Sequence, residues 1–444
     1  MLGYYLRLAL KSFRRNPGLT AVMVGAIALG ISVCVVTLTV YHAMSGNPIW
    51  WKNDRLYAVT MDLWDPKKPA DPRHPALPPS QMSYNDATAL AASGIPERSV
   101  IMFREEGVVS GGSAQRKPLP AGTRMTTADF FSMFDVPFLY GSGWSAAADS
   151  GPEPLMVLSK RENEKLFGGV NSVGRTLRWN DRPFRVVGVL DDWFPIPKFF
   201  DVTTGAFGQP EDVYIPLRWA MRLELAPNGG STDCWALQEL HSYRDFLNSD
   251  CVWLQMWVEL PNAATRAHMQ SFMDAYWAQQ HRAGRFLRPR NNRLTPVDQW
   301  LADNDVVDND NRVFVGMACA FLAVCLINTV GILLARFLGR APITGVRRAL
   351  GASRGDVFTQ HLVEVGAVAL AGAGFGLLLA VLGLWGLHAL YAAPERGGYQ
   401  ELAHFDNASI IWAIALAVVS AAAAGLYPAW RIGRLPPAIY LKSQ

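Results

Sequence analysis

Four long apolar runs without a charged side chain constrain this chain more than any other feature. Residues 313–335 and 365–390 contain no charged residue, and each exceeds the roughly 20 apolar residues that a helix needs to cross about 30 Å of hydrocarbon. Two further runs, 19–44 and 408–430, have the same character. We therefore predict a membrane protein with four transmembrane α-helices, one before and three after a large polar stretch.

The basic residues indicate how these helices cross the membrane. Residues 45–312 carry more acidic than basic side chains, so the net charge of +4 comes from the rest of the chain. In the rest of the chain, only Arg396 is predicted to lie on the outer side of the membrane. The other cations all lie next to the predicted spans on the opposite side: Arg7, Lys11, Arg14, Arg15, Arg336, Arg340, Arg347, Arg348, Arg354, Arg431, Arg434 and Lys442. The positive-inside rule then predicts cytoplasmic termini and a cytoplasmic connector, 336–364, with 45–312 and the loop 391–407 outside. Because the cations are split among three membrane-flanking clusters, we expect no nucleic-acid partner.

The chain ends are predicted from their charge pattern. Residues 1–18 form an amphipathic stretch that favours a cytoplasmic interfacial helix. A cleaved signal peptide is the alternative, but the apolar run 19–44 is too long for one and no A-x-A site follows it. Residues 431–444 form a basic cytoplasmic tail.

Residues 45–312 predict a large extracytoplasmic α+β domain with two subdomains. The clearest strands are 155–158, 176–179 and 184–190, with "NDRP" (180–183) as a hairpin turn between the last two. Helices are expected at 163–167 and 262–286, and the proline-rich segment 66–80 predicts an extended surface loop. The acidic stretch 303–311 resembles a calcium loop in composition but lacks its central Gly and terminal Glu, so a solvated linker is favoured.

The connector 336–364 holds five arginines and contains "VRRALGAS" at 346–353. Ile343, Val346, Arg347 and Leu350 predict a short helix with an apolar and a cationic side, ended by Gly351. Such a helix can dock in a groove on a cytosolic partner. The alternative is a basic loop that only anchors topology, which explains the arginines but not the break at Gly351.

Small residues within the predicted spans indicate close helix packing. Gly372 and Gly376 form a G-x-x-x-G pair, and Gly425 follows four alanines in the last span. Small residues let helices approach closely in lipid. Packing within the bundle and a dimer seam are both open interpretations. We expect the charge of Glu364 at the inner interface, because a charge at the midplane costs about 2.5 kcal/mol or more.

The chain carries no recognisable catalytic or metal motif. It contains no Gly-Lys dipeptide and hence no phosphate-binding P-loop, and no H-E-x-x-H or C-x-x-C pattern. We predict a non-catalytic chain that binds no cofactor itself. Cys34, Cys319 and Cys325 lie in predicted spans as packing residues, whereas Cys234 and Cys251 are the only outer-domain pair and predict a disulfide in an oxidising compartment.

Three segments resemble the MacB/FtsX-type permeases of ABC transporters. The connector "GVRRALGASRGDVFTQHLVE" (345–364) is similar to the coupling region of that family, and "GLYPAWRIGRLPPAIYLK" (425–442) resembles the family's last helix and tail. Outside the membrane, 127–145 and 157–190 are similar to the MacB-like outer domain. The order of one helix, a large outer domain and three further helices extends the resemblance over nearly the whole chain.

The resemblance implies a bacterial inner-membrane permease that works by mechanical transmission, with its large domain in the periplasm. MacB members carry a fused ATPase, which this sequence lacks, so a separate ABC ATPase subunit that binds ATP and Mg is implied. Its other implied partners are membrane lipids, a second permease copy or paralogue, a periplasmic adaptor and an outer-membrane channel. The residues expected to couple to the ATPase are Ile343, Gly345, Val346, Arg347, Arg348, Leu350, Gly351, Arg354 and Asp356.

One further departure and two rival functions accompany this resemblance. The family places an acid before its Ile-Gly pair where this chain reads "APITG" (341–345), which allows one half of an asymmetric pair. An FtsX-like regulatory scaffold that activates an outer enzyme is the first rival. A membrane-anchored sensor or hydrolase without an ATPase is the second. The cargo stays open among a lipoprotein, a peptide, an antibiotic and a lipid.

Overall fold

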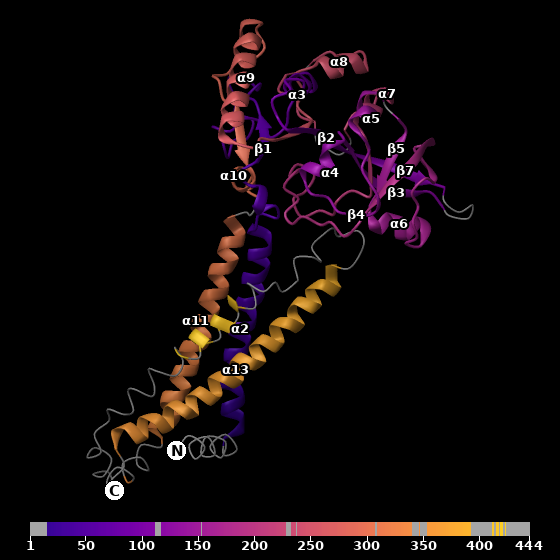
Figure 1. The fold of residues 1–444 in the computed structure, drawn as a ribbon. Helices are drawn as coiled ribbons and strands as arrows, with labels where there is room; N and C mark the ends of the chain where they lie inside the picture. Colours follow the sequence, from indigo (N-terminus) through magenta and orange to yellow (C-terminus); the bar gives the residue numbers. More distant parts are fainter. Residues whose placement is uncertain are drawn as a thin grey trace. The chain divides into compact units, whose positions relative to one another are not determined.

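The computed structural model describes residues 16–111, 117–151, 153–227, 232–236, 238–306, 309–339, 346, 353–391 and scattered positions between 411 and 422. The chain forms two compact units (Figure 1). One unit, Ser45–Val307, is the outer unit, and the other, Met1–Met44 with Asp308–Gln444, is the membrane unit.

Three long helices form most of the described part of the membrane unit. These are α2 (Pro17–Ser45), α11 (Asn309–Leu338) and α13 (Arg354–Tyr391). Each contains a stretch long and apolar enough to cross a membrane, as predicted for the first three spans. The predicted fourth span, 408–430, lies largely outside the described residues, so the count of four stays a prediction.

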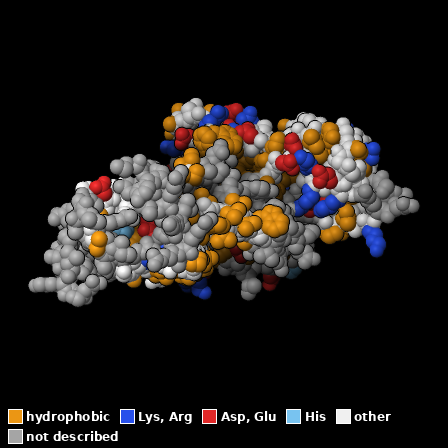
Figure 2. Space-filling view, turned by 90° about the horizontal axis from the view of Figure 1, so that it is seen from below, with side chains coloured by type: hydrophobic (Ala, Val, Ile, Leu, Met, Phe, Trp, Pro, Cys, Tyr) orange, Lys and Arg blue, Asp and Glu red, His pale blue; other side chains and the backbone are white. Residues whose placement is uncertain are grey.

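The three helices pack around an apolar core and expose apolar side chains on their other faces. Ile27 and Ile31 of α2 lie in the core with Leu322 of α11 and Val368 of α13. Facing outward, Ile327, Leu370 and Trp385 are 69%, 68% and 70% exposed. Hydrophobic side chains gather in patches in the space-filling view, and acidic and basic side chains mix in separate clusters (Figure 2). Apolar outward faces are what a lipid environment requires.

The outer unit combines ten strands with a series of short or medium helices. The strands are β1 (Leu56–Thr60), β2 (Arg98–Ser110), β3 (Leu119–Thr126), β4 (Phe138–Gly141), β5 (Leu155–Leu158), β6 (Thr176–Trp179), β7 (Arg182–Leu190), β8 (Val213–Pro216), β9 (Gln255–Glu259) and β10 (Arg293–Pro296). The helices are the 3-10 turn η1 (Trp50–Lys52), then α3 (Tyr84–Ala91), α4 (Asp129–Met133), α5 (Ala146–Ser150), α6 (Lys160–Phe167), α7 (Leu217–Arg222), α8 (Tyr243–Asn248), α9 (Ala263–Arg282) and α10 (Val297–Asp303).

One mixed sheet connects all ten strands in the order β10-β1-β9-β2-β3-β8-β5-β7-β4, with β6 beside β2 and β7. The long strand β2 joins the two ends of this sheet, because its first residues pair with β9 and its later ones with β3 and β6. Two apolar cores accompany the sheet: one contains Trp179, Trp253 and Phe103, and the other contains Phe130, Trp257 and Trp300. The strands and both cores belong to one compact unit of the chain, and the expectation of two subdomains within it stays a prediction.

The strongest local predictions match the structure closely. Strands β5 and β6 have the predicted bounds, and α6 ends at Gly168, whose φ of 70° is the left-handed conformation that glycine favours. The hairpin turn is shorter than predicted. Asn180 and Asp181 form it with φ of 44° and 62°, and Arg182 and Pro183 already belong to β7. Asparagine and aspartate tolerate these positive φ values better than other residues with a side chain.

Candidate functional site

The end of the membrane unit where α11 ends and α13 begins, here called the connector end, holds a buried polar contact among three helices. The guanidinium of Arg336 on α11 lies 3.4 Å from a carboxylate oxygen of Glu364 on α13. A second nitrogen of the same guanidinium donates to the hydroxyl of Thr20 on α2 at 3.4 Å. Nearby, the rings of Phe337 and His361 lie 4.4 Å apart.

The ion pair between Arg336 and Glu364 is almost completely buried. The side chains of Arg336 and Glu364 are only 2% and 5% exposed. A buried charge is costly unless it is paired, and removing one partner of such a pair destabilises a protein by about 3–5 kcal/mol. Each of the two residues therefore depends on the other, and the pair joins α11 to α13 at this point.

A capping box fixes the first turn of α13. The backbone N–H of Asp356 donates to the hydroxyl of Ser353 at 3.1 Å. In return, the backbone N–H and the hydroxyl of Ser353 donate to the Asp356 carboxylate at 3.1 and 2.7 Å. This reciprocal pattern satisfies amide groups that a helix start leaves open. The helix thus begins eleven residues before the span predicted at 365, and the last part of the connector is helical.

The predicted coupling residues fall into two groups. Val346 is helical and 51% exposed, Arg354 is the first residue of α13, and Asp356 belongs to the capping box. Outside the described residues lie Ile343, Gly345, Arg347, Arg348, Leu350 and Gly351. Gly425, predicted for helix packing, also lies outside them.

The G-x-x-x-G pair of α13 packs against α2 within the same bundle. A Cβ atom placed on Gly372 would lie 2.7 Å from Cβ of Ile27, and one on Gly376 would lie 3.0 Å from the backbone oxygen of Ala28. Of the two interpretations left open by the sequence, packing within the bundle is the one that the structure shows. Gly30 of α2 plays the same role toward α11, where a Cβ would lie 2.9 Å from Leu322.

Hydrogen bonds connect two segments of the outer unit that are far apart in the sequence: the one that follows α2 and the one that precedes α11. The side-chain amide of Asn47 donates to Asp298 at 2.7 Å and to Asn53 at 3.1 Å. The backbone N–H of Asp298 in turn donates to Asn53 at 3.1 Å. Residues 47–53 follow α2 and α10 precedes α11, so these hydrogen bonds join the first and the last segments of the outer unit.

A fully buried ion network continues from α10 into the sheet. The indole N–H of Trp300 on α10 donates to the carbonyl of Phe199 at 2.9 Å. Two residues further along, Asp201 accepts from the guanidinium of Arg124 on β3 at 2.6 Å. The same guanidinium also donates to Glu211, and both acids and the arginine have no exposed side-chain surface. The loop 191–212 is therefore fixed to the centre of the sheet.

Opposite charges keep this network ionised despite its burial. Burial alone would raise the pKa of Asp201, but the charges of Arg124 and Lys198 outweigh it and hold the pKa below its ordinary value. The pKa of Glu211 is lowered for the same reason. Burial, in contrast, dominates at Lys198 and lowers the pKa of its ammonium group. Complete burial with charged partners on every side identifies a structural network.

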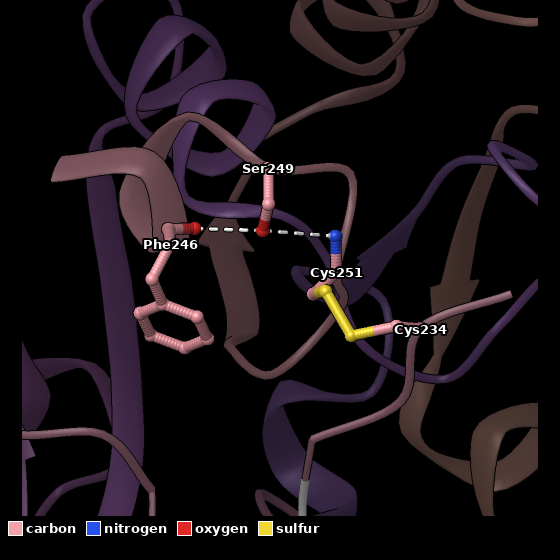
Figure 3. Close-up of a disulfide and its surroundings, with 4 residues drawn as sticks. All are labelled: Cys234, Phe246, Ser249 and Cys251. Atoms are coloured by element: carbon pink, nitrogen blue, oxygen red, sulfur yellow. Dashed lines mark hydrogen bonds between the residues drawn. A yellow bond between two sulfur atoms is a disulfide. The ribbon is translucent and has the colours of Figure 1, made fainter. Parts of the chain in front are cut away.

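Cys234 and Cys251 are joined by a disulfide (Figure 3). Their Cα atoms lie 4.4 Å apart, and the bond closes a loop with a sequence separation of 17. Beside it, the hydroxyl of Ser249 donates to the carbonyl of Phe246 and accepts from the backbone N–H of Cys251, so the segment after α8 is held at two points.

Among the described residues, no group of three or more potential ligands is arranged to hold a metal ion.

Comparison with known proteins identifies the two units. The MacB-like periplasmic core domain family matches residues 20–275, and the FtsX-like permease C-terminal family matches residues 315–437. The pyoverdine export ATP-binding/permease protein PvdT of Pseudomonas aeruginosa is 23% identical over 376 residues, which cover 84% of this chain and 49% of that protein. The macrolide export ATP-binding/permease protein MacB of Rhodospirillum rubrum is 24% identical over 454 residues, which cover 100% of this chain and 60% of that protein.

A likeness also exists to the solved periplasmic region of MacB from Actinobacillus actinomycetemcomitans. It has a TM-score of 0.35 and 12% identity, and it covers 58% of this chain and 92% of that one. The present chain spans about half to three-fifths of the length of the curated relatives it matches. From the two family matches, which together cover most of its length, the chain belongs to the MacB/FtsX-type permeases of ABC transporters.

Proposed function

We propose that this permease transmits ATP-driven motion from a separate ATPase subunit to its outer domain, and that this motion serves export. The contact that carries the proposal is the buried one between Arg336 and Glu364, which joins α11 to α13 at the connector end. Because Thr20 bonds to the same guanidinium, a force applied to the connector reaches all three described spanning helices.

The ties within the outer unit support the second half of this transmission. Asn47, Asn53 and Asp298 link the segment after α2 to the helix before α11. From α10 the hydrogen bond of Trp300 leads to the loop that the buried Arg124 fixes to β3. A displacement that reaches residues 47–53 or α10 would therefore be passed into the sheet.

The proposal includes a topology and a set of partners. Both termini and the connector face the cytoplasm, and the outer domain lies in the periplasm of the bacterial inner membrane. The ATPase that binds ATP and Mg is a separate chain, and a second permease copy or paralogue completes a dimer. An adaptor and an outer-membrane channel extend the assembly. The names of the relatives, which export pyoverdine or macrolides, favour export as the purpose.

The test compares two connector arginines with one in the outer unit. The full chain is purified from native membranes with the ATPase that accompanies it and reconstituted into nanodiscs. We expect R347A/R348A to reduce ATPase stimulation to the level of the ATPase alone. The matched control R178A, on an exposed side chain of β6, should retain wild-type stimulation. Unchanged stimulation in R347A/R348A would refute the coupling role.

One observation favours a second function, that of an FtsX-like scaffold which activates an outer enzyme without transport. Apart from the contact of Arg336, Glu364 and Thr20 at the connector end, the core between α2, α11 and α13 consists mainly of apolar side chains, whereas an aqueous path needs polar ones. A release assay with reconstituted vesicles separates the two functions, because the scaffold would respond to ATP without releasing any cargo.

A further inference from the structure

Two cysteine side chains meet between α2 and α11, at a place that the proposed coupling does not use. The Sγ atom of Cys34 on α2 lies 3.8 Å from the Sγ atom of Cys319 on α11. Both are free thiols. Cys34 is completely buried, whereas Cys319 is exposed on the surface of the membrane unit. The pair therefore joins an interior position of one helix to an accessible position of the other.

The backbones of the two helices lie close together one turn away from the thiols. A Cβ atom on Gly30 would lie 3.3 Å from Cα of Leu322 and 3.2 Å from Cβ of Cys325. Gly30 precedes Cys34 by four residues and Leu322 follows Cys319 by three, so both contacts belong to one antiparallel helix interface. A disulfide has an Sγ–Sγ distance of about 2.05 Å, so the two sulfur atoms need to approach by roughly 1.8 Å more.

The thiol pair lies within apolar sequence. Its two residues belong to the uncharged runs 19–44 and 313–335. Cys34 lies eleven residues before the end of α2 and Cys319 ten residues after the start of α11, which places each about 15 Å along its helix. Because charged groups are costly within a bilayer, an oxidant that reaches the pair has to be apolar. Exposure makes Cys319 the thiol that such an oxidant meets first.

We propose that Cys34 and Cys319 form a disulfide when an apolar hydroperoxide reaches the helices, and that this bond fixes α2 to α11. The Sγ atom of Cys319 attacks one peroxide oxygen, the O–O bond breaks, and the thiol proton leaves with the other oxygen as an alcohol. The Sγ atom of Cys34 then attacks the sulfenic acid on Cys319. The S–S bond forms, the S–O bond breaks, and the hydroxyl group leaves with the Cys34 proton as water. Two thiols and one hydroperoxide thus give one disulfide, one alcohol and one water molecule.

The bond would connect the two helices that flank the outer unit in the sequence. Helix α2 ends where the outer unit begins, and α11 starts directly after the outer unit ends. A covalent link at this depth prevents the two helices from shifting against each other, so we expect oxidation to abolish ATPase stimulation. This consequence rests on the proposed function, whereas formation of the bond does not.

The first test detects the bond itself. The full chain in nanodiscs is treated with cumene hydroperoxide, the remaining thiols are alkylated, and the protein is digested without a reductant. We expect mass spectrometry to find a peptide linked through Cys34 and Cys319, and a non-reducing gel to show no dimer joined by a disulfide. C34S and C319S should lack the link. C325S, the matched control in the same interface, should form it as the wild type does, and oxidised glutathione, a charged oxidant, should not produce it.

The second test measures ATPase stimulation on the same samples. It should be lost in the oxidised wild type and retained in oxidised C34S. The bond is refuted if oxidised wild type lacks the linked peptide, if Cys319 links two copies instead, if C325S prevents the link, or if oxidised glutathione forms it equally well. Full stimulation in cross-linked wild type would refute the effect of the bond on transmission, and the separate R347A/R348A comparison would show whether the coupling role still holds.

Discussion

The guanidinium of Arg336 and the carboxylate of Glu364 lie 3.4 Å apart inside the membrane unit, although the two residues are 28 positions apart in the sequence. The connector that runs between them contains one of the segments that resemble the ABC permease family. Arg336 and Glu364 are the first and last residues of this connector, so their buried ion pair brings its two ends together. In the proposed function, a force on this loop would be transferred to both helices through its buried base.

The ion pair predicts strongly unequal effects of single and double substitutions. R336M removes the cation that Glu364 faces, so we expect a loss of about 3–5 kcal/mol in the free energy of unfolding. R336M/E364M replaces both charges with apolar groups and should recover most of that loss. Denaturant unfolding of the reconstituted chain measures both. The exposed control E153Q should have no measurable effect, and additive losses in the double variant would contradict the pairing.

The close approach of α13 to α2 predicts opposite effects at two neighbouring glycines. G372A would bring a methyl group within 2.7 Å of Ile27, and such overpacking costs about 1–3 kcal/mol. Nothing lies within 4 Å of a Cβ at Gly374, so G374A should be neutral or stabilising, since alanine favours a helix by up to about 1 kcal/mol. Thermal unfolding in nanodiscs compares the two. Equal destabilisation would show that α13 does not contact α2 in this way.

The lowered pKa values of Asp201 and Glu211 predict how acid affects the outer domain. A carboxylate whose pKa is lower when folded stabilises the protein fully above its unfolded pKa of about 4. That stabilisation is lost as the pH falls from there toward the folded pKa. We therefore expect tryptophan-monitored stability to fall steeply below about pH 4, and D201N to be less stable at pH 7 with a shallower acid dependence. D181N should follow the wild type, and parallel curves for D201N and wild type would contradict the assignment.

The disulfide predicts a definite thiol count and a definite loss on its removal. Unreduced, denatured protein should show three free thiols, those of Cys34, Cys319 and Cys325. C234S/C251S should lower the free energy of unfolding of the outer domain by about 3 kcal/mol, as expected for a loop of this length. A count of five thiols would show that the bond does not form.

Features with a local pattern were predictable from the sequence. An uncharged run longer than 20 residues has few alternatives to a spanning helix, so three spans were found. Strands β5 and β6 and the helix that ends at Gly168 likewise depend on neighbours within a few residues. The start of α13 was missed because a span was predicted from its apolar residues alone. The S-x-x-D signal at Ser353 and Asp356 marks its true beginning.

Features that depend on distant partners were not predictable. In the sequence alone, Arg124 looks like an ordinary polar residue of a strand, because its partners Asp201 and Glu211 follow 77 and 87 residues later. Asn47 and Asp298 are 251 residues apart. Arg336 and Glu364 were both noted in the sequence, but as separate interfacial charges, since nothing local shows which charges become buried together. Pairing of this kind emerges only from the packing of whole helices.

The sidedness of the connector tests the central claim most directly. Single cysteines are introduced at Val346, which is 51% exposed, and at Glu153 in the outer unit, and intact spheroplasts are treated with a membrane-impermeant maleimide. The account predicts that E153C is labelled at once, whereas V346C is labelled only after the membrane is permeabilised. Labelling of V346C in intact spheroplasts would place the connector outside, beyond the reach of any cytosolic ATPase, and would contradict the account.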